Sequence, residues 1–155
     1  MEFLAQYHPL LVHFPIAFFF LYLIFESSGI IFKKEYLLKS AIIILALGVI
    51  GSVESVLTGN QAAELLKVQG NLTSEISEAI EEHESWATIT LWFFVIVLTL
   101  RVFLTVNKKF TGNIRYIFVI LSLIGVFLIY KTGEYGGKLV YEHGAGTKVL
   151  INNSR

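Results

Sequence analysis

Four histidines are the residues of this chain best suited to chemistry: His8, His13, His83 and His143. A histidine in or beside a lipid bilayer is costly unless something binds it, and imidazole nitrogen is a common ligand of iron, copper and zinc. The chain contains no cysteine. This excludes disulfides, iron–sulfur clusters, thiolate metal sites and covalently attached haem c. Histidine nitrogen and carboxylate oxygen are therefore the candidate protein ligands of a metal or haem.

The elements that must position these histidines are membrane helices. Of the 155 residues, 55% are hydrophobic and 15% are charged, against about 25% charged in soluble domains. Four apolar stretches have about the 20 residues that a span needs. We predict spans over about 9–32, 37–57, 86–106 and 114–130. The predicted fold is one all-α domain over residues 1–155, an integral membrane four-helix bundle made of two helical hairpins.

Lysine and arginine near the span ends predict the orientation of the bundle. The first and third connections are basic, whereas the middle one has Lys67 against six glutamates. We therefore predict a multi-pass protein of the bacterial inner membrane with the basic connections in the cytoplasm. Both termini and all four histidines then lie at the outer face. Residues 1–7 contain no lysine or arginine, so we expect the first helix to be retained rather than cleaved as a signal peptide.

The third helix is predicted to begin before its membrane span. Thr73 or Ser74 can cap a helix whose first turn contains Glu75. An apolar stripe follows at helical spacing and consists of Ile76, Ile80, His83 and Ala87. We therefore expect His83 to face the bundle on a helix that extends beyond the membrane.

An internal repeat relates the two hairpins. The segments VLTGNQAAELLKVQG (56–70) and YKTGEYGGKLVYEHG (130–144) match at an offset of 74, and His13 and His83 differ by 70. We predict a duplicated hairpin whose pseudo-two-fold axis runs along the membrane normal. Such an axis would bring His13 and His83 together across the bundle as the axial ligand pair of a haem.

Small residues near these histidines favour a flat cofactor. Ala62 and Ala63 match Gly136 and Gly137 in the repeat and would let a macrocycle approach the backbone. The ordinary alternative is close helix–helix packing. Glu54 is a candidate acceptor for a histidine Nδ1–H, and its alternative is a side chain extended to the interface.

The opening HPLLVHFP predicts a helix with His8 as its N-cap and a kink at Pro15 that turns His13 inward. In the closing segment we predict a bend at Gly133, Gly136 and Gly137 and a reversal at Gly144. The 132–147 segment would then fold over the bundle mouth and bring His143 to the cofactor layer. His8 and His143 would be a second ligand pair or partners of the haem propionates. Glu26 and Arg101, near the opposite end, are expected to pair or to extend to the interface.

Several of these motifs together resemble one family. HPLLVHFPIA (8–17), TGNQAA (58–63), His83 with the apolar helix that follows it, and GGKLVYEHGAGT (136–147) are similar to an uncharacterised bacterial family of four-helix membrane proteins, domain of unknown function 2231. The resemblance covers nearly the whole chain and implies all four histidines as signature positions. Relatives joined to or found near c-type cytochrome or Rieske domains imply redox work at the outer face. No activity comes with the family.

The sequence leaves three functions open. The leading hypothesis is a b-type haem protein, with one or two haems, that passes electrons near the outer face to a c-type cytochrome or another redox partner. The second is a copper or zinc site built from the same histidines. The third is a structural subunit that anchors a respiratory complex. Each of the three functions is compatible with a homo-oligomer. The haem hypothesis favours an electron carrier over a stand-alone enzyme. The net charge of zero gives no sign of a nucleic-acid partner.

Overall fold

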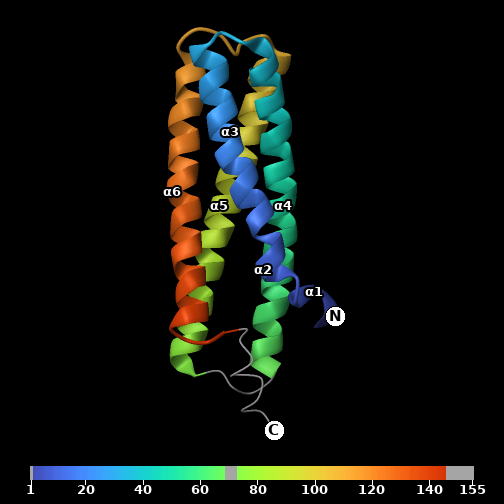
Figure 1. Cartoon of the computed structure of the whole chain (residues 1–155), viewed down its shortest axis with the longest axis vertical. Helices are drawn as coiled ribbons and strands as arrows, with labels where there is room; N and C mark the ends of the chain where they lie inside the picture. Colours follow the sequence, from blue (N-terminus) through green and yellow to red (C-terminus); the bar gives the residue numbers. More distant parts are fainter. Residues whose placement is uncertain (1, 69–72, 146–155) are drawn as a thin grey trace.

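The computed structural model describes residues 2–68 and 73–145, and this part of the chain is helical with no strand. Figure 1 shows four long helices side by side, with two short ones at the N-terminus. The elements are α1 (Glu2–Ala5), α2 (His8–Leu11), α3 (His13–Ile31), α4 (Glu35–Val68), α5 (Ser74–Val106) and α6 (Ile114–Tyr141). The predicted all-α four-helix architecture is confirmed.

The four long helices alternate in direction and form two hairpins, α3–α4 and α5–α6. Each packs against two neighbours, because α4 also contacts α5 and α3 also contacts α6. Four helical segments are long and apolar enough to cross a membrane: His8–Ile31, Glu35–Val68, Ser74–Val106 and Ile114–Tyr141. Leucine, isoleucine and phenylalanine side chains are exposed along their outer faces, as expected for a bundle surrounded by lipid.

The two ends of the bundle differ. The connections 32–34 and 107–113 lie at one end, which we call the turn end (Figure 1). The start of α2, the end of α4, the start of α5 and the end of α6 lie at the other, which we call the histidine end. Lys33 and Lys108 both have positive φ angles, 54° and 55°, and so close the two turns alike. All four histidines belong to the histidine end, as the sequence predicted.

Helix α5 begins where its capping signal predicted. The Thr73 side chain accepts a hydrogen bond from the Ile76 backbone N–H at 3.3 Å, and Ser74 is the first helical residue. Ile76 and Ile80 are buried in a small apolar cluster with Ala63 and Leu139. This cluster extends the packed core beyond the predicted spans, because α4 and α6 also continue past theirs.

The first membrane segment is interrupted between α2 and α3. Pro15 has no N–H to donate to the Leu11 carbonyl, and the helix breaks at Val12. The N-cap of α2 is Tyr7 rather than His8, so the predicted start was one residue late. Pro15 is buried and packs on Gly51 of α4, where an added Cβ would lie 3.3 Å from the proline Cδ.

Candidate functional site

His8 and His83 face each other at the histidine end. His8 is the first residue of α2, and His83 lies in the third turn of α5. Their ring centroids are 6.5 Å apart and the ring planes make an angle of 75°. Both side chains are half-buried. The structure thus brings together two imidazoles from different hairpins.

The ring of His8 is oriented by Thr58 of α4. Its Nδ1 lies 3.1 Å from the Thr58 hydroxyl oxygen. That hydroxyl donates its own proton to the backbone carbonyls of Glu54 and Ser55, at 2.9 and 3.1 Å. When the hydroxyl donates to these carbonyls, its oxygen accepts from the ring, and the proton of neutral His8 is then on Nδ1.

The ring of His83 is oriented in the same way by α6. Its Nδ1 lies 3.1 Å from the backbone carbonyl oxygen of Thr132, which can only accept. The Thr132 hydroxyl lies 2.9 Å from the hydroxyl of Thr90. Thr90 belongs to α5 and lies two helical turns after His83. The Thr132 carbonyl thus holds His83 with the proton on Nδ1 and the lone pair on Nε2, and His8 has the same arrangement when the Thr58 hydroxyl donates to its helix. Metal-binding histidines are held in this way, by an Nδ1–H that donates to an oxygen.

Two glycines allow the rings to lie close to their supporting helices. An added Cβ would lie 2.9 Å from His8 Cε1 at Gly59 and 3.1 Å from His83 Cε1 at Gly136. The space predicted for a macrocycle at Gly136 is thus occupied by the His83 ring. An added Cβ at Gly137 would approach only the Tyr141 ring, at 4.0 Å. Ala63 belongs to the buried cluster with Leu139, and its neighbour Ala62 is half-buried.

His13 does not share this arrangement. Its side chain is exposed, so the predicted inward turn at the Pro15 kink is wrong. His8 shares the inward face of the segment with Pro15 and Phe19, which are buried and follow it by 7 and 11 residues, whereas His13, five residues after His8, lies about 140° round the helix. Glu54 is also exposed; it contributes only its backbone carbonyl, which accepts from Thr58.

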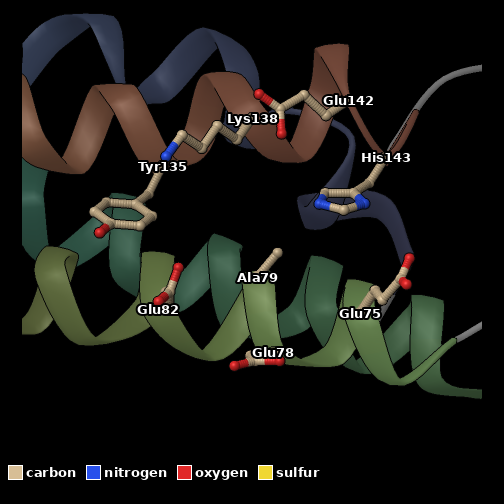
Figure 2. Close-up of a pocket in the computed structure, with 8 residues that line it drawn as sticks. All are labelled: Glu75, Glu78, Ala79, Glu82, Tyr135, Lys138, Glu142 and His143. Carbon is tan, nitrogen blue, oxygen red and sulfur yellow. The ribbon is translucent and has the colours of Figure 1, made fainter.

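His143 lies at the end of α6, in a cavity of about 240 Å³ between α5 and α6. Figure 2 shows its ring over α5, above the stretch between Ala79 and Glu75. The other lining residues are Glu78, Glu82, Tyr135, Lys138 and Glu142. In the described part of the chain, no contact joins His143 to His8 or His83.

The predicted bend in α6 is wrong. The helix continues through Gly133, Gly136 and Gly137 to Tyr141, because glycine is tolerated within membrane helices. The reversal at Gly144 is confirmed by its φ of 64°. Residues 146 and 147 of the predicted fold-back lie outside the described residues.

Three contacts between α2–α3 and α5 join residues 75 positions apart. They are His8 with His83, Phe19 with Phe94, and Glu26 with Arg101. The phenylalanine rings stack with centroids 3.6 Å apart, and the ion pair measures 2.9 Å from Arg101 Nε to Glu26 Oε1. The internal repeat predicted from the sequence did not include this offset of 75, because it paired His83 with His13. The signal was present in the like residues at 8 and 83 and at 19 and 94.

No curated protein and no solved structure matches the chain. The family described as "Predicted membrane protein (DUF2231)" matches residues 5–149, which include every helix from α2 to α6 and all four histidines. The match covers nearly the whole chain, and its description agrees with four helices able to cross a membrane. The chain is a multi-pass membrane protein and belongs to the DUF2231 family.

Proposed function

We propose that this protein is a membrane b-type haem protein that transfers electrons at its histidine end, with His8 and His83 as the axial ligands. One observation supports this above all, the 6.5 Å between the two ring centroids. Metal–nitrogen bonds of about 2.0–2.1 Å put two opposed ligand nitrogens about 4 Å apart, and about 1.1 Å from each nitrogen to its ring centre gives about 6.3 Å. The rings already have the separation of two imidazoles on one metal.

A haem is favoured over a zinc ion by the number of protein ligands. Structural zinc sites use four protein ligands and catalytic ones three. Within residues 2–68 and 73–145, no group of three or more histidine, aspartate or glutamate side chains is placed to hold a metal ion. A haem needs only two, since the macrocycle supplies the other four nitrogens. Two axial histidines leave no open iron position for a substrate, so we propose an electron carrier rather than an enzyme.

A single copper ion is the second candidate. The observation that favours it is the packing of both rings on Gly59 and Gly136, which fills the space where a macrocycle was expected to approach the backbone. Copper accepts imidazole nitrogen and needs no additional space between the helices. Both candidates use the same two Nε2 atoms.

The proposed orientation places the histidine end at the outer face of a bacterial inner membrane. Lys33 and Lys108 lie in the turns at the other end, where basic residues favour the cytoplasm. The electron partner would be a c-type cytochrome or another redox protein outside the membrane. If neither haem nor copper binds, the remaining hypothesis is an anchoring subunit.

The test is the visible spectrum and metal content of detergent-purified protein. We expect a Soret band and the sharp reduced bands of low-spin haem, lost or converted to high spin in His8→Ala and in His83→Ala. His13→Ala is the matched control, because this neighbouring histidine is exposed. One copper per chain without haem would select the second candidate. An unchanged low-spin spectrum in both His8→Ala and His83→Ala would exclude the ligand assignment.

A further inference from the structure

Glu26 of α3 and Arg101 of α5 form an ion pair inside the bundle. Their side chains are 0% and 1% exposed. Besides the 2.9 Å contact, Arg101 Nη2 lies 3.4 Å from Glu26 Oε2 and 3.4 Å from the Leu38 carbonyl oxygen. The guanidinium carbon lies 3.3 Å from the centre of the Phe110 ring. Ionisable residues within a membrane span are costly, so a pair that is kept there calls for a reason.

The position of the pair in the bundle suggests that reason. Glu26 is 18 residues from His8, a rise of about 27 Å, so the pair lies near the turn end. The contacts His8–His83 and Phe19–Phe94 have the same offset of 75 and join like residues. Where residues at equivalent positions meet, they lie on or near the pseudo-two-fold axis. Glu26 and Arg101 also meet there, but their charges are opposite.

This difference decides which hairpins can pair. If hairpin α3–α4 paired with the same hairpin of a second chain, Glu26 would face another Glu26 in the bundle interior. If hairpin α5–α6 did so, Arg101 would face Arg101. The Phe19–Phe94 stack would form equally well in either arrangement, because phenylalanine would still meet phenylalanine. In the bundle interior, the charged layer thus distinguishes the correct pairing from these two alternatives; at the surface, the 3.3 Å contact of Arg115 in α6 with Glu35 in α4 also joins opposite charges of the two hairpins.

We propose that the Glu26–Arg101 pair is a recognition element that makes hairpin α3–α4 pair with hairpin α5–α6 and prevents either hairpin from pairing with the same hairpin of a second chain. Burying two like charges together costs several kcal/mol. A buried ion pair, in contrast, adds little stability over apolar residues of similar volume. The pair therefore acts through specificity, as polar residues at single core positions do in coiled coils. This role is independent of any cofactor at the histidine end.

The experiment uses the full chain in two differently tagged copies, co-expressed and purified in detergent. Glu26→Leu/Arg101→Met removes both charges and keeps the volume. We expect this variant to fold. Co-purification of the copy that carries the second tag should rise about tenfold or more above wild type, as expected for a loss of at least 1.4 kcal/mol of discrimination. Phe19→Leu/Phe94→Leu is the matched control, an axial pair of like residues whose replacement should leave co-purification at the wild-type level.

Charge reversal completes the test. Glu26→Arg and Arg101→Glu each place like charges on the axis, and we expect the yield of monomer to fall about tenfold in each. The double reversal Glu26→Arg/Arg101→Glu should restore the monomer, since opposite charges meet again at equivalent positions. A neutral pair that folds and co-purifies no more than wild type would overturn the proposal. So would a double reversal that recovers no more monomer than the single variants.

Discussion

The Thr58 hydroxyl holds the His8 ring from α4, with 3.1 Å between its oxygen and His8 Nδ1. The equivalent bond of His83 has the same length but ends on the backbone carbonyl of Thr132. The two rings are thus oriented alike by acceptors of different chemistry. A substitution of Thr58 removes the hydroxyl that holds His8, whereas no side-chain substitution removes the backbone carbonyl that holds His83.

Thr58→Val is therefore expected to loosen His8 alone. Loss of a hydrogen-bond partner of a ligating histidine typically weakens metal affinity by about 10–100-fold. We expect a loss of this size when haem or copper is titrated into the apoprotein and followed by absorbance. Thr132→Val is the matched control, because the carbonyl that holds His83 remains. Equal affinities of wild type and Thr58→Val would show that the hydroxyl does not position a ligand.

Gly59 and Gly133, which occupy matched positions of the predicted repeat, test the packing of the His8 ring. An added Cβ would lie 2.9 Å from His8 Cε1 at Gly59, whereas nothing lies within 4 Å at Gly133. Gly59→Ala should displace the His8 ring and lower cofactor occupancy. Gly133→Ala should leave occupancy unchanged and raise helix stability by up to about 1 kcal/mol. Occupancy is read from the absorbance per chain; a Gly59→Ala protein with full occupancy would contradict the close approach.

The local chemistry of the sequence predicted much of this fold. The Thr73 cap and the stripe of Ile76 and Ile80 correctly predicted an α5 that begins at Ser74. Spans of apolar residues predicted four long helices, and the basic turns predicted which ends lie together. These features depend on residues near one another in the chain, so one sequence suffices to read them.

The candidate site depends on contacts between distant segments, and here the prediction was less complete. His83 was correctly expected to face the bundle, where it bonds to Thr132. Its partner was expected to be His13, because a kink at Pro15 was expected to turn that ring inward, but the His13 side chain is exposed. The inward residue is His8, which continues the buried face of Pro15 and Phe19 at helical spacing. The duplication of the hairpins stays a prediction, supported by the contacts at an offset of 75.

The stacked rings of Phe19 and Phe94 are expected to dominate the packing in the middle of the bundle. Both are buried, and their centroids are 3.6 Å apart. Phe94→Ala leaves a cavity that neighbouring helices cannot fill, which in protein cores costs about 3–5 kcal/mol. We expect a clear fall in the melting temperature in detergent. Phe127→Ala is the control, because this α6 side chain is 55% exposed. Equal melting temperatures for the two variants would argue against a packed centre.

The orientation of the bundle decides which compartment the histidine end faces. Lys33 and Lys108 occupy equivalent turns with φ of 54° and 55°, and the positive charge near these turns favours the cytoplasmic side. A reporter active only in the cytoplasm should therefore work when inserted next to Lys108, and a reporter active only outside should work when inserted between Val68 and Thr73. Replacing Lys33, Lys34, Lys108 and Lys109 by glutamine should weaken this preference and yield a mixed population. A reporter beside Lys108 that is active outside would reverse the bundle and turn His8 and His83 toward the cytoplasm, where a periplasmic cytochrome could not reach them.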